Sequence, residues 1–134
     1  VTLFMGGNGI GGGMVINGRL WTGASGYCSE VGFLPVYERL NKGSLGLPPA
    51  EHISELYARL IQVYAVTVNP HMMVLYRHPL LEGRLDEIRR LCASYLPSKA
   101  IPSIELSYDY QQDYEKGLFT VAKSLEQAVS EGGL

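Results

Sequence analysis

The residues best suited to chemistry are the glycines near the start of the chain, in the stretch GGNGIGGG over residues 6–13. Backbone N–H groups in such a loop can hold a phosphate, because no side chain blocks the approach. The spacing Gly7-x-Gly9-x-x-Gly12 matches the dinucleotide-binding fingerprint, but that motif must open a helix, and an apolar strand follows here. No Gly-Lys-Ser/Thr closes a Walker loop either. A strand–loop–strand hairpin remains, which is either an anion site or only a tight turn.

The other polar residues are weaker candidates for a site. His52 lies in the first turn of a predicted helix and is expected at the surface, while His71 and His78 flank a predicted buried strand, at turn positions. Asp109 and Asp113 follow the last predicted strand, at the end of a sheet where α/β proteins bind ligands, but capping of the next helix explains them better. We therefore predict no catalytic residue in this chain.

Composition and charge exclude several classes of function. The chain has 134 residues, 46% of them apolar, which suits one globular domain. The net charge of −2, with both signs interspersed, gives no surface for nucleic acid, and no apolar run is long enough to cross a membrane. Cys28 and Cys92 are far apart and form no metal motif. We expect free buried thiols, no metal site and a reducing, cytoplasmic location.

The sequence pattern predicts an α/β fold in which three antiparallel strands precede alternating helices and strands. Asn17-Gly18 is a strong hairpin signal between the second and third strands. The expected strands cover residues 2–5, 14–17, 19–22, 72–76 and 103–108, and the expected helices cover residues 48–68, 83–96 and about 111–129. The order β-β-β-α-β-α-β-α matches a ribonuclease-H-like (actin-like ATPase) lobe with a mixed five-stranded sheet.

One stretch resembles a known family. GGNGIGGGMVINGRLWTGASGYCSEVGF, over residues 6–33, is similar to the signature of the ROK family of bacterial repressors and sugar kinases. Val68-Asn69-Pro70 and the C-terminal segment with Gly117 and Ala122 resemble the family more loosely. The resemblance implies a single C-terminal lobe over residues 1–134. Because the chain opens directly on a strand, we expect a fragment without its N-terminal lobe.

The resemblance also implies two binding sites. In the family, the glycine loop faces the phosphates of ATP, and a glutamate hydrogen-bonds sugar hydroxyls. A carboxylate suits that task because it accepts two hydrogen bonds from neighbouring hydroxyls. The match assigns the sugar contact to Glu30 and the phosphate contacts to Gly7, Asn8 (in place of threonine), Gly9, Gly11, Gly12 and Gly13.

Four departures from the family pattern weaken the case for a kinase. Phe33 stands where the family has a sugar-contacting histidine, and residues 34–47 hold none of the cysteines of the family's zinc cluster. Tyr76-Arg77-His78 replaces the Gly-Gly that lies against adenosine, so bulky side chains would obstruct a nucleotide. The family's catalytic aspartate belongs to the other lobe. The chain alone is therefore expected to be inactive.

Two hypotheses for function follow. The first is a non-catalytic lobe of a ROK-like transcriptional regulator or sensor, which binds a sugar or sugar phosphate and needs no cofactor. DNA would be bound only through a segment outside this chain. The second is the ATP-binding C-terminal half of a zinc-free ROK sugar kinase, which would use ATP and Mg²⁺.

We also expect a homodimer through the helix over residues 48–68 and an irregular segment over residues 27–47. Relatives in the ROK family typically pair through this lobe, and tyrosine is enriched at interfaces. The tyrosines concerned are Tyr27, Tyr37, Tyr57, Tyr64 and Tyr95.

Overall fold

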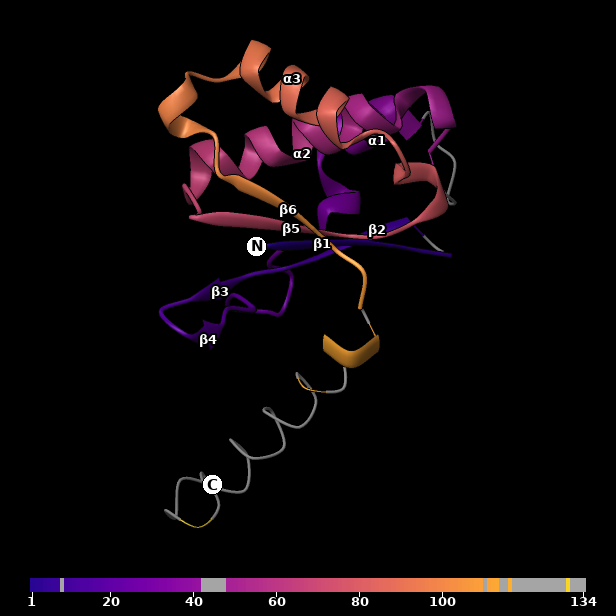
Figure 1. The fold of residues 1–134 in the computed structure, drawn as a ribbon. Helices are drawn as coiled ribbons and strands as arrows, with labels where there is room; N and C mark the ends of the chain where they lie inside the picture. Colours follow the sequence, from indigo (N-terminus) through magenta and orange to yellow (C-terminus); the bar gives the residue numbers. More distant parts are fainter. Residues whose placement is uncertain (8, 42–47, 110, 114–115, 117–129, 131–134) are drawn as a thin grey trace.

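The centre of the fold is a four-stranded sheet with helices packed on one of its faces (Figure 1). The computed structural model describes residues 1–134 except 8, 42–47, 110, 114–115, 117–129 and 131–134. The strand order is β2-β1-β5-β6, in which β2 is antiparallel to β1, and β1, β5 and β6 are parallel. The strands are β1 Thr2–Gly6, β2 Gly9–Gly13, β5 Met72–Tyr76 and β6 Ser103–Ser107, and the helices are α1 Pro35–Asn41, α2 Ile53–Thr67 and α3 Leu85–Tyr95.

Alternation along the strands explains which face the helices cover. In β1 and β5 the alternate residues Leu3, Met5, Met73 and Leu75 are buried, and their neighbours are half-buried or exposed. Because successive side chains of a strand point to opposite faces, all four lie on the side of the helices. The other face of the sheet carries the T-shaped ring pair of Phe4 and Tyr76, whose centroids lie 6.5 Å apart.

Helix α2 is the main component of the core. Five of its side chains, Ile53, Leu56, Tyr57, Leu60 and Ile61, have no exposed surface, because α2 packs against α1, α3 and the sheet. The sequence prediction of this helix is confirmed, but Tyr57 and Leu60 cannot form a dimer interface because they lie inside the chain. The homodimer itself stays a prediction.

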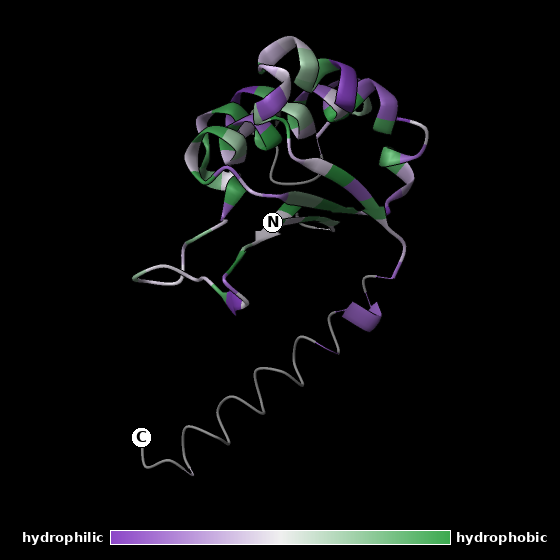
Figure 2. Ribbon diagram, turned by 60° about the vertical axis from the view of Figure 1, so that its left-hand side comes forward, coloured by the Kyte–Doolittle hydropathy of each residue, from purple (hydrophilic) through white to green (hydrophobic). Residues whose placement is uncertain are grey.

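The prediction of a five-stranded sheet is wrong for its second and third strands. Residues 14–22 do not join the sheet; they form a separate hairpin, β3 (Val15–Ile16) with β4 (Arg19–Leu20), on the side away from the helices (Figures 1 and 2). The second strand of the sheet is the glycine run itself. The turn prediction is confirmed, because Asn17 and Gly18 both have positive φ, 51° and 77°, as the favoured hairpin turn requires.

The connections also differ from the prediction in two places. The segment over residues 27–47 is not wholly irregular, because it contains the 3-10 helix η1 (Val31–Phe33) and α1. Further 3-10 helices, η2 Ala50–His52, η3 Pro79–Leu81 and η4 Ser98–Ala100, precede α2, α3 and β6. The last predicted helix lies mostly outside the described residues. Residues 111–113, at its start, are helical. The two other predicted helices and the strands β5 and β6 are confirmed.

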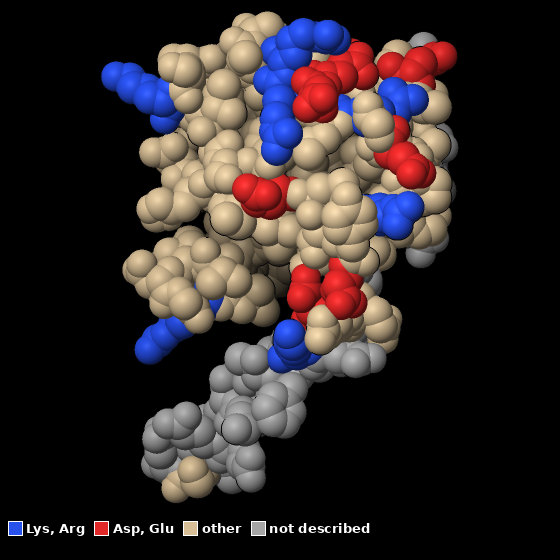
Figure 3. Space-filling model, viewed as in Figure 1, with Lys and Arg blue, Asp and Glu red and all other residues tan. Residues whose placement is uncertain are grey.

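The surface of the helices and the surface of the β3–β4 hairpin differ in polarity. On the face shown in Figure 3, charged side chains gather mainly over the helices. The hairpin instead exposes large apolar side chains: Val15, Ile16, Leu20 and Trp21. Among the described residues, no helix has the length and apolar character needed to span a bilayer.

Two buried tyrosines, Tyr37 and Tyr57, provide a matched test of the packing. The Ile10 N–H donates to the Tyr37 hydroxyl at 3.1 Å inside the core, whereas the buried Tyr57 hydroxyl has no hydrogen-bond partner among the residues that the structure describes. Tyr37→Phe should lower the free energy of unfolding by about 1–3 kcal/mol, because it leaves a buried N–H unsatisfied. Tyr57→Phe should change it by about 1 kcal/mol or less. Urea unfolding of both variants measures the difference, and equal losses would contradict this account.

Candidate functional site

The glycine run forms a hairpin strand rather than a loop. β2 pairs with β1 along its whole length, from Gly6 opposite Gly9 to Thr2 opposite Gly13. The turn between the strands contains Gly7, and Asn8 lies outside the described residues. Gly9 has a φ of 120°, a conformation that L side chains rarely adopt. The predicted loop is therefore reduced to a tight turn at the carboxyl end of β1.

The glycines of this run have different surroundings. A Cβ added at Gly7 or Gly11 would meet no atom within 4 Å, so these positions are open. One added at Gly13 would lie 3.0 Å from Thr2 Oγ1. One added at Gly12 would lie 2.9 Å from the Ser29 carbonyl oxygen and 3.0 Å from the Tyr64 hydroxyl. Gly7 and Gly11 can thus approach a ligand, whereas Gly12 is needed for packing.

The close approach at Gly12 joins the glycine run, predicted to contact phosphate, to the turn with Glu30, predicted to contact sugar. Without a side chain at Gly12, the backbone of Ser29 lies directly against β2, and Glu30 follows it. Ser29 has a φ of 71°, which is uncommon for a residue with a Cβ and is found most often at functional sites. The structure therefore brings the glycine strand beside the turn that carries Glu30.

Glu30 lines a shallow hollow together with two exposed aromatic rings. The hollow has a volume of about 280 Å³ and is lined by Gly26, Tyr27, Glu30 and Phe33. Tyr27 is 67% exposed and Phe33 is 79% exposed, although their rings contact each other with centroids 5.9 Å apart. Exposed rings of this size usually mark a binding surface when they gather beside a polar group.

A second hollow adjoins the first and shares two of its residues, Tyr27 and Glu30. It has a volume of about 190 Å³, and its other lining residues are Ser29, Val31, Leu34, Val63, Tyr64 and Thr67. Burial raises the pKa of Tyr64 above its ordinary value, because the charged phenolate would lose its hydration. Together the two hollows offer one carboxylate, several hydroxyls and apolar surface.

The carboxyl ends of β5 and β6 hold a different group of side chains. Arg77 lies 5.5 Å from the centroid of the Tyr108 ring and 3.7 Å from the Glu82 carboxylate. They line a hollow of about 240 Å³ with His78, whose Nδ1 accepts a hydrogen bond from the Leu80 N–H. The side chains predicted to obstruct a nucleotide therefore do lie at this end of the sheet.

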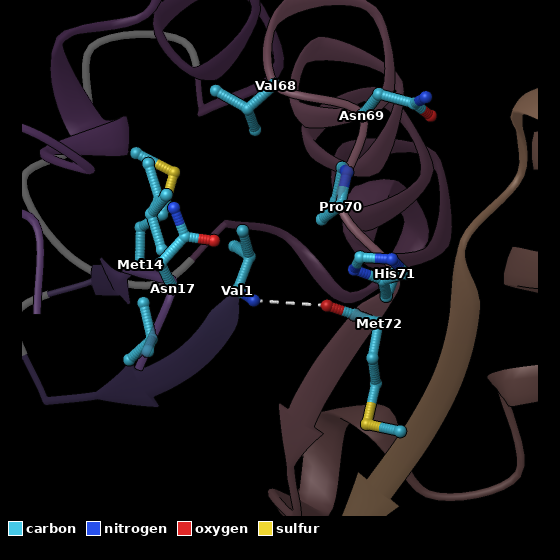
Figure 4. A pocket seen from close by; sticks show the side chains of 10 residues that line it. Val1, Met14, Asn17, Val68, Asn69, Pro70, His71 and Met72 are labelled. Atoms are coloured by element: carbon cyan, nitrogen blue, oxygen red, sulfur yellow. Dashed lines mark hydrogen bonds between the residues drawn. The ribbon is translucent and has the colours of Figure 1, made fainter. Parts of the chain in front are cut away.

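A larger hollow lies between the β3–β4 hairpin and the turn that leads from α2 to β5 (Figure 4). It has a volume of about 360 Å³. Met14 and Asn17 line it from the hairpin, and Val68, Pro70 and His71 line it from the opposite side. Its walls are mostly apolar, and among the described residues that line it His71 has the only ionisable side chain. Nothing in its chemistry indicates a particular ligand.

The other predicted polar residues have structural roles. Asp109 Oδ1 accepts from the Gln112 N–H at 3.2 Å, as predicted for a helix cap, and Asp113 accepts from the Tyr76 hydroxyl. His52 is 3.7 Å from Glu51 near the surface. Both cysteines are free, as predicted; Cys92 is buried and Cys28 is partly exposed. Burial raises the pKa of Cys92 to about 11. Among the described residues, no three potential metal ligands are grouped together.

Sequence reasoning missed the two rings beside Glu30. The spacing Tyr27-x-x-Glu30-x-x-Phe33 could have indicated them. The 3-10 helix η1 places Phe33 on the same side as Glu30, and the bond from the Glu30 N–H to the Tyr27 carbonyl closes the turn before it. No protein-family model matches the chain, and no curated protein is significantly similar to it. The resemblance to the ROK family therefore rests on the sequence motif alone.

Proposed function

We propose that this chain is the sugar-binding lobe of a ROK-like transcriptional regulator or sensor, and that it recognises its effector without catalysing a reaction. The observation that carries the proposal is that Glu30 lines one hollow with the exposed rings of Tyr27 and Phe33. A carboxylate accepts hydrogen bonds from neighbouring sugar hydroxyls. Aromatic rings cover the apolar C–H face of a pyranose. The ROK motif assigns the sugar contact to the same glutamate.

The kinase alternative has one observation in its favour. Gly7 and Gly11 have open space around them, as a phosphate clamp requires. Two observations weigh against it. Gly12 packs against Ser29 and Tyr64. Arg77, which lies against Tyr108, belongs to the segment that the family resemblance would put beside adenosine. We therefore favour the regulator or sensor, for which the glycine strand has a structural role.

Titration calorimetry with common hexoses and N-acetylhexosamines tests the proposal. We expect one of these sugars to bind, and Glu30→Gln to weaken its affinity by about tenfold or more, since hydrogen bonds to a charged group contribute about 1.5–3 kcal/mol. Phe33→Ala should also weaken binding without unfolding the chain, because the ring is mostly exposed.

Glu38→Gln is the matched control, because Glu38 is an exposed glutamate on the neighbouring α1 and lines neither hollow. Binding of that variant should equal that of the unaltered chain. If no sugar binds at tens of millimolar, the proposal fails. A parallel titration with Mg·ATP separates the alternatives, since micromolar affinity would favour the kinase.

A further inference from the structure

The described residues that line the two hollows around Glu30 include an acidic side chain and no basic one. Among the described residues that line them, none is lysine, arginine or histidine, and Glu30 has the single carboxylate. The remaining polar groups are uncharged hydroxyls: Tyr27, Ser29, Tyr64 and Thr67. The surroundings of any bound ligand are therefore negative or neutral.

Backbone N–H groups can replace basic side chains in phosphate sites, but here they are already used. The first N–H groups of this turn donate within the turn itself. The bonds are Glu30 N–H to the Tyr27 carbonyl at 3.2 Å, Val31 N–H to Ser29 at 2.9 Å and Phe33 N–H to Glu30 at 3.1 Å. Anion sites built from backbone need such groups free and pointing at the ligand. The N–H groups of Glu30, Val31 and Phe33 are therefore not available to a ligand.

We infer that the site selects unphosphorylated sugars and rejects sugar phosphates. The inference rests on the proposed function. It decides between free sugars and sugar phosphates, the two ligand classes that the proposed function leaves open. A phosphate ester carries nearly two negative charges at neutral pH. Beside the Glu30 carboxylate, with no cation to balance it, that charge is repelled and loses part of its hydration. An uncharged pyranose has no such penalty.

Phe33 strengthens the selection. A histidine at this position would donate a hydrogen bond and could become positively charged next to Glu30. Phenylalanine can do neither, so Phe33 gives the hollow apolar surface and no positive charge. Phe33 is therefore a specificity-determining residue for an uncharged ligand.

Paired titrations test the inference. The probes are glucose with glucose 6-phosphate and glucose 1-phosphate, and N-acetylglucosamine with its 6-phosphate. We expect each bound sugar to have at least tenfold higher affinity than its phosphorylated partners, and the ratio to fall as salt is added, because screening weakens the repulsion. Glu30→Gln should reduce the ratio while it lowers the affinity for the free sugar. Glu38→Gln should leave the ratio unchanged.

The outcomes separate this inference from the proposed function. If a sugar phosphate binds as tightly as the free sugar, or more tightly, the charge selection is overturned and sugar binding stands. If the ratio is the same in Glu30→Gln as in the unaltered chain, Glu30 does not cause the selection and the inference fails. If neither form of any sugar binds, the proposed function fails, and this inference fails with it.

Discussion

Leu60→Ala should lower the free energy of unfolding by roughly 2–5 kcal/mol, the usual range for a leucine removed from a packed core. Leu60 lies on α2 between the sheet and the other helices and has no exposed surface. Removing its side chain forfeits the transfer free energy and leaves a cavity that a close-packed core refills only in part. Denaturant unfolding followed by circular dichroism measures the loss.

Val66→Ala is the control on the same helix. Val66 is 68% exposed, so its truncation should change the free energy of unfolding by about 0.5 kcal/mol or less. A charge at position 60 should unfold the chain and not merely separate a dimer. If the Leu60→Ala chain kept its full stability and only its oligomeric state changed, α2 would lie at an interface and this description of the core would be wrong.

Local patterns in the sequence explain why part of the fold could be predicted. The apolar spacing from Ile53 to Tyr64 indicates a helix with one wide apolar face, and α2 is that helix. Asn17-Gly18 indicates a two-residue hairpin, because both residues accept positive φ, and the hairpin forms there. In both cases the signal lies in neighbouring residues, so no distant contact is needed to read it.

The identity of the second strand depends on contacts that no local pattern carries. Glycine has low strand propensity, and Gly9–Gly13 contains a single apolar side chain, that of Ile10. The run becomes a strand because the edge of β1 offers it a partner and because Tyr37 binds the Ile10 N–H from α1. Residues 14–22 do not extend the sheet beyond β2, and they pair with each other instead.

The candidate site, like the fold, could be predicted from the sequence only in part. The motif pointed to Glu30, and the structure leaves Glu30 exposed in a hollow. That Tyr27 and Phe33 remain mostly exposed beside it could not be predicted, since phenylalanine is usually buried and tyrosine is commonly half-buried. α1 was missed because it is a short helix, although Pro35 at its first position is a recognised start signal.

Gly12→Val should lower the free energy of unfolding by about 3 kcal/mol or more, because it places three carbons where there is no room. A Cβ alone would lie 2.9 Å from the Ser29 carbonyl oxygen, a backbone atom that cannot move without shifting Glu30. We therefore expect this variant to lose sugar affinity as well as stability. Gly12→Ala is the milder form of the same change if the valine variant does not fold.

Gly11→Val is the matched control for Gly12→Val, because the two glycines are neighbours on β2 and a Cβ at Gly11 would meet no atom within 4 Å. Its stability should be unchanged or higher, since valine favours strands more than glycine does. Denaturant unfolding compares the two variants, and sugar titration of the folded chains shows whether the Glu30 hollow survives. Equal losses for Gly11→Val and Gly12→Val would mean that the run needs glycine for backbone freedom, as a ligand-facing loop does, and not for contact with Ser29.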